Sequence, residues 1–132
     1  MIIALQRLGI AFFTFHLLTV RGRRTGKPRT TPVSPFHVDG KRYVMSFGQT
    51  EWVRNARAAG EAVLSRGRRR VEVSLVELPA AERAKIAREF PRLVPGGIAV
   101  FIRTGVVHPP GDADAFEAAA PHLAVFRIDP QH

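Results

Sequence analysis

The stretch that decides the fold spans residues 17–33 and reads Leu17-Leu18-Thr19-Val20-Arg21-Gly22-Arg23-Arg24-Thr25-Gly26-Lys27-Pro28-Arg29-Thr30-Thr31-Pro32-Val33. Two runs of strand-forming residues flank a short segment rich in glycine and arginine. Gly22 and Gly26 permit a tight turn, because glycine reaches positive φ angles at little steric cost. The positive charge of this segment comes from Arg23, Arg24, Lys27 and Arg29. The stretch therefore predicts a β-hairpin with a cationic tip, which suits a phosphate or another anion.

Outside this hairpin, the turn signals of the sequence predict further antiparallel strands. Asp39-Gly40 is the strongest two-residue hairpin signal in the sequence, and Gly67 predicts another tight turn. Pro32 and Pro35 indicate that the second strand lies at an edge or contains a bulge, because proline has no N–H to donate. The expected strands, about six in total, cover residues 16–21, 29–38, 42–47, 61–65, 68–78 and 123–128.

Helices are expected between these strands. Thr50 is placed to cap a helix over residues 51–59, which Gly60 would end. Pro79 suits the start of a second helix, which we expect Pro91 and Pro95-Gly96-Gly97 to stop.

The C-terminal third is less clearly patterned. Residues 98–104 fit either a buried strand or a short helix, and Asp112 or Asp114 caps a last small helix. Hairpins with helices inserted after the third and fifth strands favour an α+β barrel over a parallel layered fold.

The chain length and the N-terminal segment limit the domain organisation. With 132 residues, of which 45% are apolar, residues 1–132 fit a single domain with a buried core. Residues 1–15 are apolar but are interrupted by Gln6, Arg7 and Gly9. They predict an N-terminal helical extension packed on the domain, and neither a signal peptide nor a membrane span. Contact of this extension with a membrane surface is the alternative.

Charge and residue usage narrow the classes of partner. The net charge of +9 favours an anionic ligand, and the basic residues concentrate at 21–29 and 66–70, of which the second cluster is expected to be a solvated hairpin tip. Because no aromatic residues are interleaved with these cations, nucleic-acid binding is not expected. The chain has no cysteine, and none of its histidines is spaced i,i+4, so no metal site is expected. The lack of cysteine is compatible with a reducing cytoplasm.

Several motifs carry a resemblance to a known family. They are Gly22-Arg23-Arg24-Thr25-Gly26-Lys27-Pro28-Arg29-Thr30-Thr31-Pro32, Asp39-Gly40, Tyr43-Val44 and Trp52-Val53-Arg54-Asn55-Ala56. On these residues the chain resembles the deazaflavin-dependent nitroreductase family, whose members use coenzyme F420, and the resemblance covers nearly all of the chain after about residue 15. It implies a split β-barrel related to the flavin-binding pyridoxamine-phosphate-oxidase fold. The cofactor would lie in a groove lined by the second and third strands and the following helix.

The resemblance also implies which residues bind the cofactor. Those expected near its phosphate and acidic tail are Arg23, Arg24, Thr25 and Lys27. Those expected along its ring and side chain are Arg29, Thr30, Thr31, Pro32, Val33 and Ser34. The end of the third strand would add Met45, Ser46, Phe47 and Gly48, and the helix would add Trp52, Val53, Arg54 and Asn55. All would form one groove, in which Val33, Met45 and Phe47 would wall the ring. Only residues 49–51 separate Gly48 from Trp52, where many family members have a longer loop that touches the phosphate.

The expected activity follows from this resemblance. The protein would transfer a hydride from reduced F420 to a quinone, a nitro compound or a conjugated carbonyl, and no catalytic acid or base is assigned because the cofactor supplies the reactivity. One alternative is an FMN-binding protein of the same barrel superfamily, and another is a non-enzymatic carrier of an anionic or lipid ligand. We expect a cytoplasmic protein, with membrane contact through residues 1–15 as the alternative, and a homodimer through the exposed edge strand at residues 29–38.

Overall fold

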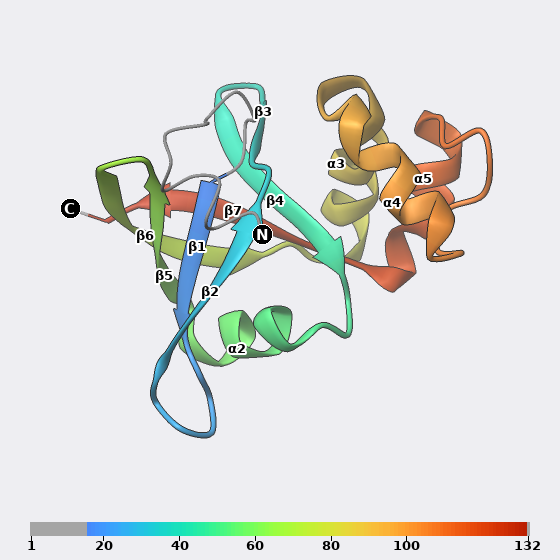
Figure 1. The fold of residues 1–132 in the computed structure, drawn as a ribbon. Coiled ribbons are helices and arrows are strands. Elements are labelled where there is room, and N and C mark those ends of the chain that lie inside the picture. Colours follow the sequence, from blue (N-terminus) through green and yellow to red (C-terminus); the bar gives the residue numbers. More distant parts are fainter. Residues whose placement is uncertain (1–15, 132) are drawn as a thin grey trace.

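A single antiparallel sheet of seven strands curls into an open half-barrel in the computed structural model, which describes residues 16–131 (Figure 1). The strands are β1 (His16–Arg21), β2 (Pro28–Val33), β3 (Phe36–Val38), β4 (Lys41–Phe47), β5 (Glu61–Arg66), β6 (Arg69–Glu77) and β7 (Leu123–Pro130). Their order across the sheet is β2-β1-β5-β6-β7-β4-β3, and every neighbouring pair is antiparallel. The predicted α+β split barrel is thereby confirmed. The predicted N-terminal helix lies outside the described residues.

The prediction of one strand over residues 29–38 is wrong, because this segment forms two strands. β2 pairs with β1, whereas β3 pairs with β4, so the two lie at opposite ends of the strand order. The break falls at Ser34 and Pro35, where proline has no N–H for a neighbouring strand and restricts the conformation of the residue before it. The homodimer expected through this edge stays a prediction.

Four α-helices accompany the sheet within residues 16–131. α2 (Glu51–Ala59) follows β4 and packs against β1, close to the β1–β2 turn (Figure 1). α3 (Ala80–Leu93), α4 (Ile98–Arg103) and α5 (Ala113–Ala119) gather in a separate layer beside the far end of β4 (Figure 1). Two short 3-10 turns, η1 (Pro95–Gly97) and η2 (Ala120–His122), precede α4 and β7. In the described part of the chain, no helix has the length and hydropathy needed to span a membrane.

Pro91 does not stop α3, so this part of the prediction is wrong. The helix continues to Leu93, and the Val94 N–H donates to the Phe90 carbonyl at 2.8 Å to close its last turn. Proline removes only its own N–H from the helical ladder, and here the helix ends within the next turn anyway.

The other helices agree more closely with what the sequence predicts. Residues 98–103 form a helix, which was one of the two alternatives. Asp112 caps α5 as predicted, because its Oδ1 accepts from the Ala115 N–H at 3.0 Å. Thr50 stands at the N-cap position of α2, but its hydroxyl donates to the Phe47 carbonyl at 3.4 Å and makes no cap.

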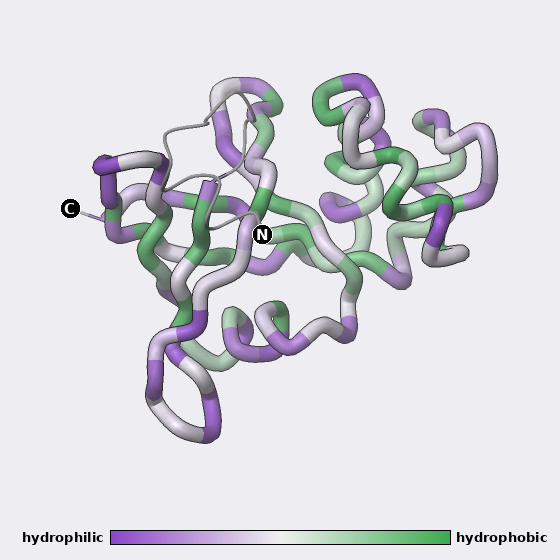
Figure 2. Tube along the Cα trace, viewed as in Figure 1, coloured by the Kyte–Doolittle hydropathy of each residue, from purple (hydrophilic) through white to green (hydrophobic). Residues whose placement is uncertain are grey.

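Two apolar cores pack on opposite faces of the same strands. Val44 and Met45, adjacent on β4, are 1% and 8% exposed and belong to different cores. Val44 faces the core under α2, which also contains Leu18, Val20, Val33, Val53 and Phe126. Met45 faces the core under α3, α4 and α5, which also contains Phe36, Phe90, Phe101, Phe116 and Leu123. Figure 2 shows the apolar residues running through both regions, whereas the β1–β2 turn is hydrophilic.

Gly60 fixes the end of α2, which positions much of the candidate site described below. Its φ is +69°, its N–H donates to the Ala56 carbonyl at 2.8 Å, and no atom lies within 4 Å of where a Cβ would stand. Gly60→Ala is therefore expected to lower the free energy of unfolding by about 1 kcal/mol through backbone strain alone. Urea denaturation measures this change. Gly60→Asn is the control, and its free energy of unfolding should fall less than that of Gly60→Ala, since asparagine tolerates this conformation better than alanine. Unchanged stability of Gly60→Ala would contradict the positive φ angle assigned to Gly60 at the end of α2.

Candidate functional site

The turn between β1 and β2, residues 22–27, is held tightly by its own backbone. The Gly22 N–H donates to the Lys27 carbonyl at 2.8 Å, and the Gly26 N–H donates to the Gly22 carbonyl at 2.9 Å. Gly26 has a φ of +73°, and a Cβ on Gly22 would lie 3.2 Å from the Thr25 hydroxyl and the Lys27 carbonyl. Both glycines are therefore needed for a turn that brings its cations to one tip. We call residues 22–27 the basic turn.

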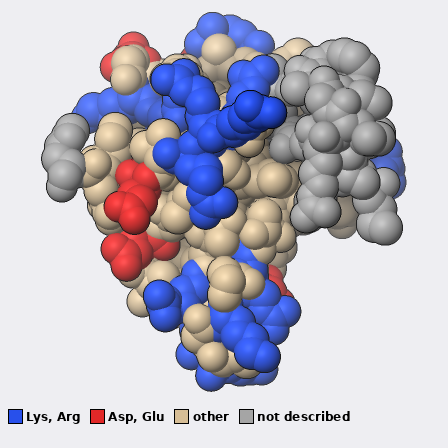
Figure 3. All heavy atoms as spheres, turned by 60° about the vertical axis from the view of Figure 1, so that its left-hand side comes forward, with Lys and Arg blue, Asp and Glu red and all other residues tan. Residues whose placement is uncertain are grey.

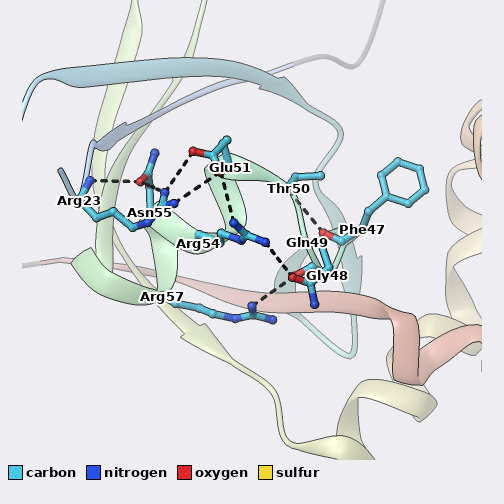
Figure 4. Close-up of polar contacts among 9 residues, drawn as sticks. All are labelled: Arg23, Phe47, Gly48, Gln49, Thr50, Glu51, Arg54, Asn55 and Arg57. Atoms are coloured by element: carbon cyan, nitrogen blue, oxygen red, sulfur yellow. Dashed lines mark hydrogen bonds and ion pairs between the residues drawn. The ribbon is translucent and has the colours of Figure 1, made fainter. Parts of the chain in front are cut away.

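α2 anchors the basic turn through one buried amide. Asn55 is 7% exposed, and it is the only buried amide or charged side chain among residues 16–131. Its Oδ1 accepts from the Arg23 backbone N–H at 3.1 Å and from Arg23 Nη1 at 2.8 Å (Figure 4). Because a buried amide oxygen needs donors, these bonds fix the turn against the helix.

Glu51, one turn before Asn55 on α2, forms an exposed ion pair with the same arginine. Arg23 Nη1 lies 3.4 Å from Glu51 Oε1, and Arg54 lies 3.7 Å from the other carboxylate oxygen (Figure 4). The hydrogen bond from Arg23 and then its charge lower the pKa of Glu51 below the ordinary value of 4.5, with smaller contributions from Arg54 and Arg24. The carboxylate therefore stays ionised at neutral pH and orients Arg23.

This pKa gives a testable pH dependence. A carboxyl whose pKa is lowered by folding stabilises the fold above its unfolded pKa and loses that contribution as the pH falls through the folded value. Acidification from about pH 6 to about pH 3 is therefore expected to release Arg23 from Glu51. The chemical shifts of the Glu51 carboxyl carbon and the Arg23 guanidinium should titrate together below the usual range for glutamate. If Glu51 titrates at the value of an unstructured peptide, the ion pair is absent in solution.

The basic turn, β2 and the start of α2 enclose a cleft of about 570 Å³. Its lining residues are Gly22, Arg23, Arg24, Thr25, Arg29, Thr30, Thr31, Thr50, Glu51, Trp52 and Asn55. Trp52 is its one aromatic lining residue, and the indole packs on Phe126 with a ring centroid distance of 5.9 Å. We call this space the turn cleft.

Three cations beside the turn cleft have no protein partner. Arg24, Lys27 and Arg29 are exposed, and within residues 16–131 their side chains form neither an ion pair nor a hydrogen bond. Figure 3 shows Lys and Arg side chains gathered at the lower end of the molecule, where Figure 1 places this turn. Unpaired cations around a cleft attract an anion with several negative charges.

Eight of the residues predicted to bind a cofactor line the turn cleft: Arg23, Arg24, Thr25, Arg29, Thr30, Thr31, Trp52 and Asn55. Lys27 lies in the basic turn beside it. The cleft also includes Gly22, Thr50 and Glu51, which were not predicted. The spacing of Glu51 and Asn55, four residues apart on one helix, is the signal that could have found Glu51.

The other predicted residues do not line this cleft, so the structure does not bring all of the predicted residues together in one groove. Val33 and Val53 are buried in the core under α2, and Met45 is buried in the other core. Phe47 packs on Phe101 at a ring centroid distance of 4.7 Å. The three residues predicted to wall the ring are therefore separated. Val33 lies in one core and Met45 in the other, and Phe47 lines a second cleft described below. The remaining residues outside the turn cleft are Pro32, Ser34, Ser46, Gly48 and Arg54. Cofactor contact by any of these residues stays a prediction.

A family model matches residues 7–101 of the chain, and its family is described as F420H(2)-dependent quinone reductase. A search of curated protein sequences gave no match.

Solved structures with the same fold give a second comparison. An F420-H2 dependent reductase, FDR-A, has a TM-score of 0.57 at 16% identity, covering 88% of this chain and 94% of its own. A putative pyridoxamine 5'-phosphate oxidase from Listeria innocua has a TM-score of 0.57 at 12% identity, covering 99% and 91%. A protein of unknown function from Agrobacterium tumefaciens has a TM-score of 0.61 at 15% identity over 90% of this chain, which spans only 49% of that protein. At these identities the likeness shows the fold alone.

Proposed function

The chain belongs to the F420H(2)-dependent quinone reductase family, a family of oxidoreductases, and we propose that it holds reduced F420 in the turn cleft and transfers a hydride to an electron-poor small molecule. The acceptor would be a quinone, a nitro compound or a conjugated carbonyl. The observation that carries this proposal is the set of unpaired cations, Arg24, Lys27 and Arg29, beside a cleft with one flat aromatic wall.

The chemistry of the lining residues fits the cofactor. F420 has a phosphate and an acidic glutamate tail, and guanidinium groups bind such oxygens through paired, charge-assisted hydrogen bonds. Arg24 and Arg29 are available for this role, whereas Arg23 is already bound to Asn55 and Glu51. We therefore assign Arg24, Arg29 and Lys27 to the tail, and Arg23 to holding the turn in place.

The ring end of the cofactor would rest against Trp52. The indole is half-buried and packs on Phe126, and an aromatic ring of this kind can stack on a tricyclic ring. Thr30 and Thr31 add hydroxyl groups on the β2 side of the cleft. When bound, the reduced deazaflavin supplies the hydride, and the protein supplies binding and orientation.

A titration distinguishes F420 from FMN and from a simple carrier function. Trp52 is the only tryptophan of the chain, so its fluorescence reports on the turn cleft alone. We expect F420 to quench this fluorescence with micromolar affinity, and FMN to bind at least about tenfold more weakly because its single phosphate meets fewer of the cations. Absence of F420 binding at low salt would refute the proposal. Tighter binding of FMN than of F420 would favour the flavin alternative.

A second titration separates the roles of tail and ring. The deazaflavin chromophore without its phosphate and glutamate tail should still quench Trp52 but with far lower affinity. Its affinity should depend little on salt, since it neutralises none of the cations. Equal affinities of the two ligands would contradict the assignment of Arg24, Arg29 and Lys27 to the tail.

A further inference from the structure

A second cleft of about 650 Å³ lies on the other side of the short connection between β4 and α2. It is lined by the end of β4, by α3 and α5, and by the loop between α4 and α5. The segment 47–49 contributes to this cleft, whereas Thr50, Glu51 and Trp52 contribute to the turn cleft. The two clefts therefore have separate linings. We call this one the helix cleft.

Arg83 on α3 lines the helix cleft, and its guanidinium has no partner. No hydrogen bond or ion pair to this side chain exists within residues 16–131, and its buried Nε is the one buried side-chain N or O atom there that lacks an acceptor or donor. A buried N–H of a charged group is costly to leave unpaired. An orphaned guanidinium at the wall of a cleft indicates a ligand that supplies the missing acceptor.

Two arginines near Arg83 are paired, in contrast to Arg83. Arg57 also lines the helix cleft, but its Nε and Nη2 donate to Glu77 at 2.8–3.0 Å. Its Nη1 donates to the Gly48 carbonyl at 3.2 Å, as Figure 4 shows. The hydrogen bonds that Arg57 donates to Glu77 raise the pKa of Arg57, and the carboxylate compensates its charge. Arg88, five residues after Arg83 on α3, is paired with Asp114 and Glu117.

The rest of the lining indicates the kind of molecule that would supply the acceptor. Apolar side chains of β4, α5 and β7 form much of the wall, among them Phe47, Ala119 and Leu123. His108 and His122 also line the cleft and are exposed, and an imidazole can donate an N–H to a ligand. The Nε–H and one Nη–H of a guanidinium lie side by side, and a carboxylate accepts from both at once. We propose that the helix cleft binds a small organic carboxylate with an apolar body, and that Arg83 is its anion-binding residue.

The proposal is independent of F420 and can be tested on the full chain without it. We would titrate the isotopically labelled protein with benzoate and, as a neutral probe of the same shape, with benzamide. Benzoate is expected to shift the Nε–H signal of Arg83 and the amide signals of α5, and benzamide to do so at least about tenfold more weakly. Equal shifts by both probes, or shifts by benzoate confined to the basic turn, would overturn the proposal.

Variants assign the binding to one side chain. Arg83→Gln is expected to weaken benzoate binding at least about tenfold, whereas Arg103→Gln, an exposed arginine of α4 outside the cleft, should leave it unchanged. Because Arg83 has no hydrogen-bond or ion-pair partner among residues 16–131, its loss should not lower the melting temperature. If Arg83→Gln fails to fold, Arg83→Lys keeps the charge without the paired donors and should bind benzoate with intermediate affinity. Wild-type affinity in either Arg83 variant would refute the proposal.

Discussion

The double variant Arg24→Gln plus Arg29→Gln is expected to bind F420 at least about a hundredfold more weakly than the unmodified chain. Hydrogen bonds to charged groups contribute about 1.5–3 kcal/mol each, and two of them correspond to a hundredfold change or more. Neither arginine has a partner among residues 16–131, so the melting temperature should not fall. Calorimetric titration with F420 at constant salt measures the loss.

A matched variant separates local binding from general attraction. Arg66→Gln plus Arg69→Gln removes the same charge from the turn between β5 and β6. That turn lies at the opposite end of the strands, because Ser65 pairs with Leu17 at the start of β1. This control should lose less than about threefold in affinity, since long-range attraction is screened at physiological salt. Equal losses in the two double variants would mean that F420 responds to net charge and not to the turn cleft.

The second large effect is expected at Asn55. Asn55→Leu keeps the size of the side chain but removes the acceptor for two donors of Arg23. We expect the free energy of unfolding to fall by about 2–3 kcal/mol, since each donor left unpaired in a partly buried position costs about 1 kcal/mol or more. F420 affinity should fall as well, because the basic turn is no longer held against α2. Urea denaturation and the F420 titration measure the two effects.

Asn55→Asp is the control for this prediction. The carboxylate keeps an acceptor at the same position and adds a charge beside the Arg23 guanidinium, so stability and F420 binding should both fall less than in Asn55→Leu. Wild-type stability of Asn55→Leu would show that Asn55 does not anchor the turn.

The fold was largely predictable because its local signals agree with one another. Buried and less buried side chains alternate along β1, and Gly22 follows its last residue. Asp39-Gly40 joins β3 to β4, and Gly67 joins β5 to β6. The break after β2 was not predicted, because the placement of β2 and β3 at opposite ends of the sheet depends on how the whole sheet assembles. The extension of α3 past Pro91 was missed for a similar reason, since packing of the helix outweighs the loss of one hydrogen bond.

The candidate site was predictable only in part. Where both faces of a strand are buried, the sequence does not indicate which face borders a cleft. Val44 and Met45 are neighbours on β4 and both are buried, so alternation gives no wet face from which to assign a groove. The cations of the basic turn were found because their charge is visible in the sequence. That Asn55 reaches back to Arg23, 32 residues earlier in the chain, is visible only once β1 and α2 are packed together.

Whether the protein transfers a hydride from F420H2 bound in the turn cleft is tested by the initial rate of F420H2 oxidation by a naphthoquinone under anaerobic conditions. We predict a protein-dependent rate that saturates with F420H2. The KM for F420H2 should rise at least about a hundredfold in Arg24→Gln plus Arg29→Gln and stay near the wild-type value in Arg66→Gln plus Arg69→Gln. A rate no higher than that without protein would contradict the account, as would equal KM values in the two double variants.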